Sequence, residues 1–328
     1  MSAITVGTAT AAPGEIANGR IEVTAMAGGA SLGMPVIVIN GANDGPCLWV
    51  DGVIHGDEPE GTLMCHLLRR EVDPATLAGS LVLVPVMNTG AFEASRRGNP
   101  LDTFSYDMNR IYPGRPNGYL TERVAHAHKE WLVEVADMNI AVHSGGEHSY
   151  LSEMIFVTDH PGSQELARAM GEAFSLVLKT PRPSGNPMGV MLAAGKSGIT
   201  VELGGRSATS PEGFRRVGRT LADAALNVMR HYRMIPGEAR YAAVRHKGVQ
   251  EALLAPASGL YLPEPGVDFQ QPLAKGDTIA RIFDVYGDEV GRISAPADGM
   301  FFGLRCLPSV MTGDWCCFYA KLDGTWDD

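Results

Sequence analysis

The amino-acid sequence predicts an α/β fold: a mostly parallel, mixed sheet flanked by helices, followed by a small all-β segment at the C-terminus. Through the first two thirds of the 328 residues, short apolar runs alternate with stretches of helical periodicity. Several runs are apolar at consecutive positions, which is typical of strands buried on both faces. After residue 238 the helical patterns stop, and Gly and Pro separate short strand-like runs. We therefore expect two domains, residues 1–238 and 239–328.

The larger predicted domain alternates strands with helices. The strands are expected over residues 34–41, 47–56, 81–89, 138–146, 153–160 and 198–205. The helices are expected over residues 59–72, 120–136, 162–178 and 214–235. Pro59 stands at the start of the first helix, where its missing N–H costs no helical hydrogen bond, and Thr121 is the predicted N-cap of the second. Ligands of such sheets usually bind at the carboxyl ends of the strands.

The C-terminal segment contains an internal repeat. The run "APASGLYLPEP" begins at Ala255 and "APADGMFFGL" at Ala295, and each copy is followed by a Gly-Asp turn and an apolar strand. This pattern predicts a small β domain of two related halves and resembles the biotinyl/lipoyl sandwich. Neither Lys275 nor Lys321 has the sequence context of the lysine modified in that fold. We therefore expect a structural module, or a wall over the active site.

Composition and charge exclude several classes of function. With 45% hydrophobic and 20% charged residues, the chain has the composition of a soluble globular protein. Its net charge of −10 argues against nucleic acid as a partner. It has no apolar run of the roughly 18 residues that a membrane span needs and no secretion-signal pattern at the start. The five cysteines show no CxxC spacing. We expect reduced thiols and a cytoplasmic protein.

Polar residues that suit a metal site stand at or near the ends of three predicted strands. His55 is followed by Glu58, His143 ends "NIAVH", and Glu202 follows "ITV". Imidazole and carboxylate are common zinc ligands, although an HxxE pair alone is a weak signal. For any one of these residues taken singly, a solvated strand terminus is the favoured interpretation. Since all of them fall at the edge where ligands bind, we favour a site.

A long segment between these strands, "RRGNPLDTFSYDMNRIYPGR", is rich in turn residues and poor in periodicity. It contains Arg96, Arg97, Asp102, Asn109 and Arg110. Long loops in compact domains are often binding loops, and guanidinium groups suit carboxylates because they form paired hydrogen bonds. For any single arginine, an ordinary solvated loop residue is an equally good interpretation.

Four motifs, in this order, resemble the succinylglutamate desuccinylase/aspartoacylase family, a branch of the zinc carboxypeptidase-like fold. They are "HGDEPEG", "RGNPLDTFSYDMNRIYPG", "VHSGG" and "TVELGG", and together they span about Val50 to Arg206. The predicted C-terminal β domain also fits this family. The "HSGG" and "ELGG" forms are most similar to the deacetylases that act on N-acetylated diaminobutyrate.

The resemblance implies a metal centre and a catalytic base. It implies one zinc ion per chain, held by His55, Glu58 and His143. It implies Glu202 as the base that activates water and then protonates the leaving amine.

The resemblance also implies roles for the residues of the long loop. Arg97, or alternatively its neighbour Arg96, would polarise the scissile carbonyl. Asn109 and Arg110 would bind the substrate carboxylate.

One position departs from the family pattern. Many members have Asp two residues before the third metal ligand, where this chain has Ala141. An Asp at this position would not bind the metal itself but would hold the metal ligands in place through hydrogen bonds. Asp57 and Asp137 are the two candidates to compensate for its absence.

The resulting hypothesis is a metal-dependent hydrolase of amide bonds other than peptide bonds. It would remove an acetyl or small dicarboxylic acyl group from an N-acylated amino acid, a small-molecule substrate. Lys196 would either contact a dicarboxylic acyl group or be a solvated lysine, and His148 is a candidate for the pocket lining. The alternatives are a zinc metallocarboxypeptidase acting on peptides and a non-catalytic binding protein. Exposed strand edges would allow a homo-oligomer.

Overall fold

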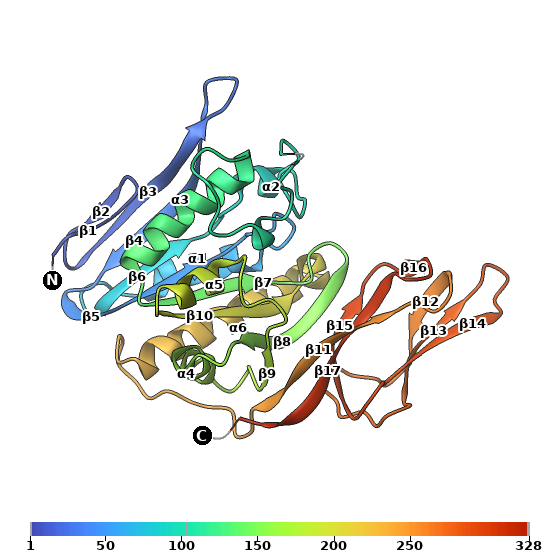
Figure 1. The fold of residues 1–328 in the computed structure, drawn as a ribbon. Helices are drawn as coiled ribbons and strands as arrows, with labels where there is room; N and C mark the ends of the chain where they lie inside the picture. The colour runs from blue at the N-terminus through green and yellow to red at the C-terminus, as the bar shows by residue number, and fades with distance from the viewer. Residues whose placement is uncertain (1, 103, 327–328) are drawn as a thin grey trace.

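The computed structural model describes residues 2–102 and 104–326, and its centre is an eleven-stranded mixed sheet with helices on both faces (Figure 1). The strands, from one edge to the other, are β15 (Gly299–Arg305), β17 (Trp315–Thr325), β11 (His246–Leu254), β9 (Leu176–Lys179), β8 (Ser149–Val157), β10 (Ser197–Gly204), β7 (Met138–His143), β5 (Asn43–Asp51), β6 (Ala78–Val84), β4 (Ser31–Asn40) and β3 (Glu15–Ala25). Four neighbouring strands in the middle, β10, β7, β5 and β6, are parallel. Their carboxyl ends therefore meet at one edge of the sheet.

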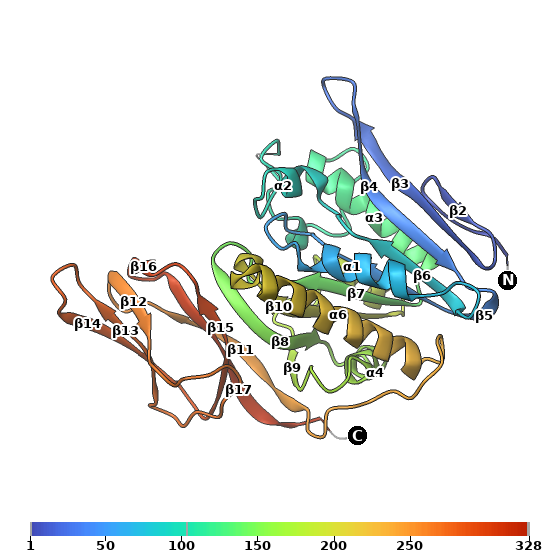
Figure 2. The same cartoon turned by 180° about the vertical axis from the view of Figure 1, so that it is seen from behind.

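Two helical layers bury the sheet, which confirms the predicted α/β class. One face packs against α1 (Glu60–Glu71), α4 (Pro161–Ala169) and α6 (Pro211–His231), and the other against α3 (Leu120–Val135) and α5 (Pro187–Ala193). Figure 1 shows α3 and α5 in front of the sheet, and Figure 2, from behind, shows α1 and α6. The relation to the zinc carboxypeptidase-like fold remains a prediction.

Strand β5 shows why the apolar runs are continuous. Leu48 and Val50 belong to the core that includes α1 and α6, whereas Cys47 and Trp49 belong to the core that includes α3. Both faces of the strand are therefore covered, and every position along it favours an apolar side chain.

Several local predictions were wrong, among them the strand expected over 81–89, which ends at Val84. The helix expected over 162–178 ends at Ala169, because Gly171, at φ +89°, turns the chain, and the apolar run after it becomes β9 between β8 and β11. The N-cap of α3 is Tyr119, whose N–H donates to the Glu122 carboxylate at 2.8 Å, while Thr121 lies inside the helix. The strand expected over 47–56 ends at Asp51.

Several elements before residue 238 were not predicted. They are the strand β3, the helix α5 and the short elements β1 (Ile4–Val6), β2 (Ala9–Ala11), α2 (Thr89–Glu93), η1 (Met108–Arg110) and η2 (Arg206–Thr209). Of these, η1 matters most for function, because it lies within the long loop and contains Asn109 and Arg110.

All the elements described between residues 246 and 325 are strands. One group, β12 (Gly259–Pro263), β13 (Thr278–Phe283), β14 (Glu289–Ser294) and β16 (Ser309–Val310), forms a separate four-stranded sheet. The other group, β11, β15 and β17, extends the main sheet. Because β15 also pairs with β8, strands β8, β9, β11, β17 and β15 close into a ring. The domain boundary at residue 238 and the lipoyl-type sandwich remain predictions, and the ring contains strands from both sides of that boundary.

A small apolar cluster holds this ring together. It consists of Met154, Leu176, Leu178, Met300, Phe302 and Ala320, all buried, with Phe156, Phe318 and Leu322 packed against them. The C-terminal segment is therefore anchored to β8, which is the direct neighbour of β10 and its Glu202. Among the described helices, none is long and apolar enough to cross a membrane.

Candidate metal centre and active site

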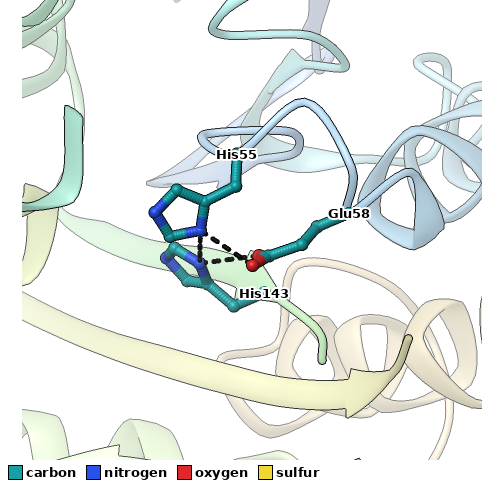
Figure 3. Close-up of side chains that lie close together, drawn as sticks. All are labelled: His55, Glu58 and His143. Atoms are coloured by element: carbon teal, nitrogen blue, oxygen red, sulfur yellow. Dashed lines mark hydrogen bonds and ion pairs between the residues drawn. The ribbon is translucent and has the colours of Figure 1, made fainter. Parts of the chain in front are cut away.

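The first two predicted metal ligands lie in the turn that joins β5 to α1. The prediction that His55 ends the strand was wrong, because β5 ends at Asp51. The irregular segment that follows β5 places His55 beyond the edge of the sheet. Glu58 follows two residues before α1 begins. His143 is the last residue of β7, the strand beside β5, as predicted. The three side chains converge on one point (Figure 3), and we call them the His–Glu–His cluster.

The geometry of the His–Glu–His cluster fits a metal ion. Glu58 lies between the two imidazoles, with its oxygens 2.8 Å from His55 Nδ1 and 3.0 Å from His143 Nδ1. The two Nδ1 atoms are 3.3 Å apart, and each residue offers one ligand atom within 4.8 Å of the others. All three side chains are at most 3% exposed. Two imidazole nitrogens and a carboxylate oxygen form a usual protein donor set for Zn²⁺.

Two of the three residues of the cluster have the charge that a metal ligand needs. Burial would lower the pKa of the third, His55, but Glu58 and Asp107 raise it, so His55 would release a proton on binding a metal. Burial would raise the pKa of Glu58, yet the charge of His55 and the hydrogen bond from His143 bring this pKa well below its usual value. Burial lowers the pKa of His143, which favours the neutral imidazole. Metals bind ionised carboxylate and neutral imidazole, so Glu58 and His143 are already in the forms that a metal site needs.

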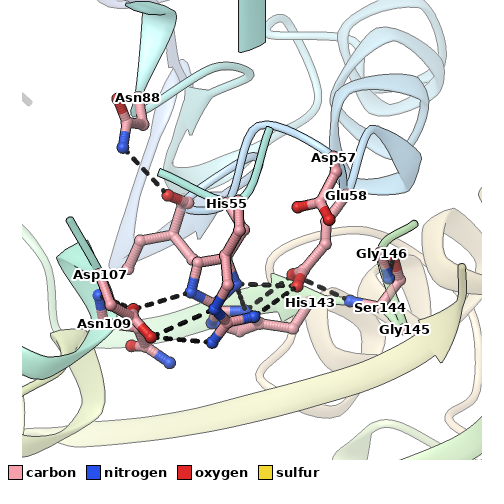
Figure 4. A network of polar contacts seen from close by, with 12 residues as sticks. His55, Asp57, Glu58, Asn88, Asp107, Asn109, His143, Ser144, Gly145 and Gly146 are labelled. Carbon is pink, nitrogen blue, oxygen red and sulfur yellow. Dashed lines mark hydrogen bonds and ion pairs between the residues drawn. The ribbon is translucent and has the colours of Figure 1, made fainter. Parts of the chain in front are cut away.

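Asp107 supports the cluster from the long loop, and no sequence signal pointed to it. Its carboxylate lies 3.1 Å from His55 Nε2 and accepts hydrogen bonds from Arg97 and from the Asn109 N–H (Figure 4). Burial alone would raise the pKa of Asp107, but the contact with His55 and the charge of Arg97 bring it well below its usual value. A carboxylate bonded to the second nitrogen of a ligand histidine fixes the orientation of the ring.

A second carboxylate, Glu60, ties the loops of the site together. It begins α1 and is fully buried, and it accepts hydrogen bonds from the Ser144 hydroxyl at 2.8 Å and from the Gly205 N–H at 2.9 Å. The Ser144 N–H in turn donates to Glu58 at 3.1 Å. Burial raises the pKa of Glu60 to about 7. The turns that follow β5, β7 and β10 are thus joined through one side chain.

Neither candidate for the role of the missing Asp supports the ligands. Asp137 accepts a hydrogen bond from the Cys47 N–H at 2.8 Å, just before β7 begins and at the opposite end of that strand from His143. Asp57 accepts from the Glu147 N–H at 3.0 Å. Compensation by direct contact of either carboxylate with a ligand is therefore not seen among the described residues. The strand register places Asp51 of β5 directly beside Ala141.

All eight predicted site residues line a single cavity of about 730 Å³. They are His55, Glu58, Arg96, Arg97, Asn109, Arg110, His143 and Glu202. Four motifs that are far apart in the sequence therefore face the same space. The individual roles of these residues remain predictions.

The family model that describes the succinylglutamate desuccinylase/aspartoacylase catalytic domain matches residues 44–232, more than half of the chain. This stretch contains every residue of the His–Glu–His cluster. The chain belongs to this family. Among its relatives, the N-alpha-acetyl-L-2,4-diaminobutyric acid deacetylase of Halomonas elongata is 28% identical over 315 residues, which cover 88% of this chain and 86% of that protein.

Solved structures support the same fold. A succinylglutamate desuccinylase from a Silicibacter species superposes with a TM-score of 0.80 at 23% identity, covering 94% of this chain and 95% of the other. A product-bound ectoine utilization protein from Ruegeria pomeroyi superposes with a TM-score of 0.79 at 24% identity, covering 93% and 94%. At this coverage most of the C-terminal segment belongs to the shared fold as well.

Arg96 and Arg97 occupy different environments. Arg97 donates to Asp107 at 3.0 and 3.2 Å and lies 3.6 Å from Glu58. Burial would lower its pKa, but the charges of Glu58 and Asp107 raise it above its usual value. Arg96 is exposed at the cavity. Of the two alternatives, Arg97 is the one fixed beside the His–Glu–His cluster.

The remaining predicted residues differ in how firmly they are held. Burial raises the pKa of Glu202 well above its usual value, and the nearby charge of Glu58 adds to this. Arg110 lies 3.9 Å from Asp107, a looser contact than that of Arg97. Burial lowers the pKa of Arg110, and a second arginine, Arg182, contributes by charge repulsion.

The cavity has further lining that the sequence did not reveal. Arg182 comes from the loop between β9 and α5, and no sequence signal pointed to it. His148 lines the cavity, as predicted. Lys196 donates to two backbone carbonyls, at 2.6 and 2.7 Å, and is not part of the lining. The C-terminal strands contribute one side of the cavity, which we call the C-terminal wall and which consists of Gln250, Ala252, Phe302, Trp315 and Phe318.

Proposed function

We propose that this protein is a zinc-dependent amidohydrolase that removes an acetyl or small dicarboxylic acyl group from an N-acylated amino acid. The observation that carries this proposal is the buried cluster of His55, Glu58 and His143 opening onto the cavity that also contains Glu202 and Arg97. Family membership supports it, and so does the name of the diaminobutyric acid deacetylase relative.

His55, Glu58 and His143 would hold one zinc ion. Bound there, zinc would supply a Lewis acid for the amide carbonyl and would lower the pKa of water. Asp107 would keep His55 oriented, and Ser144 would keep Glu58 oriented, through the hydrogen bonds described above.

Glu202 would move the proton of the reaction. Its carboxylate accepts a proton from the attacking water and passes it to the leaving nitrogen, first as a base and then as an acid. A raised pKa favours this role, because a carboxylate with a higher pKa is a stronger base toward the water proton.

Arginines would bind the charged parts of the substrate. The Arg97 guanidinium donates to the carbonyl oxygen as negative charge develops on it, and Asp107 fixes its position in advance. Asn109 and Arg110 bind the carboxylate of the amino acid, and Arg182 adds positive charge to the same cavity.

A metallocarboxypeptidase would use the same residues. The C-terminal wall favours an acyl amino acid as substrate, because it places Phe302, Trp315 and Phe318 along the cavity and limits the space for a peptide. A purely binding protein would have no use for Glu202 beside the His–Glu–His cluster.

The test combines metal analysis, an activity screen and one variant on the same preparation. We expect one zinc per chain, hydrolysis of N-acetyl or N-succinyl amino acids, and loss of activity on chelation that added zinc restores. Glu202→Gln should keep the zinc and lose activity by about 10²–10⁴-fold. Full activity in that variant would refute the role of Glu202. Turnover of peptides alone would establish the carboxypeptidase, and absence of both zinc and turnover would favour the binding protein.

A further inference from the structure

A buried polar network lies between α3 and the sheet, beside the turns that form the site. Its main members are Asp51 at the end of β5, His128 on α3 and Tyr112 from the long loop, which are 1%, 0% and 6% exposed. Trp49 and Asn139 complete it. These five residues do not line the cavity, so the network is separate from the groups that would touch a substrate.

The hydrogen bonds form one continuous chain. The Tyr112 hydroxyl lies 3.0 Å from His128 Nδ1, and His128 Nε2 lies 2.9 Å from an Asp51 oxygen. Asp51 also accepts from the Trp49 indole N–H at 2.6 Å and from the Asn139 amide at 2.8 Å. Three donors thus surround one buried carboxylate, which is the condition for keeping a charge in the core.

The direction of each hydrogen bond follows from these contacts. A carboxylate can only accept, so Asp51 accepts from the N–H at His128 Nε2. His128 Nδ1 is then the atom that accepts from the Tyr112 hydroxyl, whose pKa burial raises well above its usual value, so that the hydroxyl keeps its proton. Because Asp51, His128 and Tyr112 each have a partner for their role, this chain of three has a single favoured arrangement.

The ends of the network show what it connects. Tyr112 follows Arg110 by two residues, and its backbone N–H also donates to the Gly185 carbonyl at 3.2 Å. Asp51 is the last residue of β5, the strand that leads into the His55 turn. Well-packed apolar side chains often replace buried polar groups that bond to one another without loss of stability. The three polar residues instead provide a directional hydrogen-bonded link between the loop that contains Tyr112 and the end of β5.

We propose that Tyr112, His128 and Asp51 are positioning residues that fix the segment 109–112 so that Asn109 and Arg110 face the substrate carboxylate. This inference rests on the proposed function, because that function assigns the carboxylate to Asn109 and Arg110. A positioning role differs from a purely structural role in one respect. Removal of the Tyr112 hydroxyl should weaken recognition of the substrate carboxylate and leave the rest of the reaction unchanged.

The test is Tyr112→Phe, which removes the hydroxyl and keeps the ring. Loss of one such hydrogen bond should raise KM for N-acyl amino acids about 3–10-fold, with kcat changed less than about twofold and zinc content unchanged. For the corresponding N-acyl amino acid amides, which lack the carboxylate, kcat/KM should be unchanged. The matched control is Tyr319→Phe, in which a buried tyrosine that does not line the cavity also loses one hydrogen bond, to the Ala297 carbonyl at 2.8 Å.

Equal effects of Tyr112→Phe on acids and amides, or equal KM changes in Tyr112→Phe and Tyr319→Phe, would overturn the proposal. If the wild type hydrolyses no N-acyl amino acid, the proposed function fails. Amide hydrogen exchange then tests whether the network fixes the segment 109–112. Tyr112→Phe should then speed exchange in residues 105–112 by about fivefold or more, and Tyr319→Phe should not. An unchanged rate of amide hydrogen exchange in residues 105–112 of Tyr112→Phe would refute the inference.

Discussion

The buried Glu58 carboxylate is destabilised by the loss of solvent, yet it is the charged group that a metal ion would bind. Burial penalises its charge, yet two imidazoles and the Ser144 N–H surround its oxygens. A carboxylate that is kept ionised in the core between two imidazoles can receive a cation without losing a proton itself. His55, whose pKa burial would lower but Glu58 and Asp107 raise, has to release its proton when the cation binds.

At the residue scale, the two adjacent arginines should behave differently. Arg97→Met should lower kcat/KM by about 10²–10³-fold, because Arg97 is fixed by Asp107 beside the His–Glu–His cluster. Arg96→Met is the matched control and should cost less than about threefold, because Arg96 is exposed. Steady-state kinetics on the best substrate of the screen measures both. A larger loss from Arg96→Met would reverse the assignment.

Glu60 implies a pH dependence of stability. Its pKa is raised from 4.5 to about 7 in the folded chain, so the folded chain binds this proton more tightly than the unfolded chain. Its contribution to stability is therefore fully present below about pH 4.5 and is lost as pH rises through 7, by on the order of 3 kcal/mol. A Gln side chain can keep a hydrogen bond to each of Ser144 and Gly205 without a charge.

We therefore expect Glu60→Gln to match the wild type in free energy of unfolding near pH 5 and to exceed it near pH 8, by up to about 3 kcal/mol. Urea unfolding at the two pH values measures the difference. Glu134→Gln, a change at an exposed position of α3, is the control and should leave the pH dependence as it is. A constant difference between Glu60→Gln and wild type at both pH values would contradict the raised pKa.

At the scale of elements, the turn between β5 and α1 depends on a close backbone approach. Gly56 lies against α2, where a Cβ atom would come within 2.4 Å or less of the backbone of Ala91 and Phe92. Backbone atoms cannot move aside as a flexible side chain can. Any side chain at this position would therefore displace His55 and Glu58 together.

Gly56→Ala should weaken zinc binding by about tenfold or more, which is the range seen when the support of a metal ligand is disturbed. Competition with a chromophoric chelator measures the affinity. Gly28→Ala is the control, because a Cβ atom at Gly28 would meet nothing within 4 Å. Unchanged zinc affinity in Gly56→Ala would mean that α2 shifts to make room for the methyl group while the turn between β5 and α1 keeps its position.

At the scale of the whole molecule, the C-terminal segment completes the cavity. Its strands close the ring with β8 and β9, and the C-terminal wall lines the same cavity as the His–Glu–His cluster. Trp315 stacks on Phe318 with 4.8 Å between ring centroids. The predicted metal ligands and the wall therefore come from distant parts of the chain, and we expect the C-terminal part to limit the size of the substrate.

Trp315→Ala should widen the cavity and raise kcat/KM for bulky acyl groups or dipeptides, relative to acetyl substrates, by about tenfold. The reason is that the missing ring opens space along the wall without touching the His–Glu–His cluster. Competition between an acetyl and a bulkier substrate in one reaction measures the ratio. Tyr286→Ala, at a hairpin tip where the side chain is 90% exposed, is the control and should leave the ratio unchanged. An unaltered ratio in Trp315→Ala would show that the wall does not select substrates.

Much of the candidate site was predictable because its residues follow buried strands. His143 ends β7 and Glu202 lies near the end of β10, and strand ends can be located from apolar runs. Asp107, Glu60 and Arg182 were not predicted, because each acts through partners that are distant in sequence or lies in a loop without periodicity. The short β9 was predicted as helix, because a four-residue apolar run fits either period.

Local patterns in the chain were enough to establish the α/β class, the strand end at His143, and the residue types that suit a metal and a carboxylate. Only the folded arrangement shows which arginine lies beside the His–Glu–His cluster, which carboxylates support it, and where the C-terminal strands lie. The physical reason is that burial patterns are local and repeat along each element. Hydrogen bonds such as those of Asp107 and Asp51, and the ring that brings Trp315 to the cavity, depend on contacts between segments that only folding brings together.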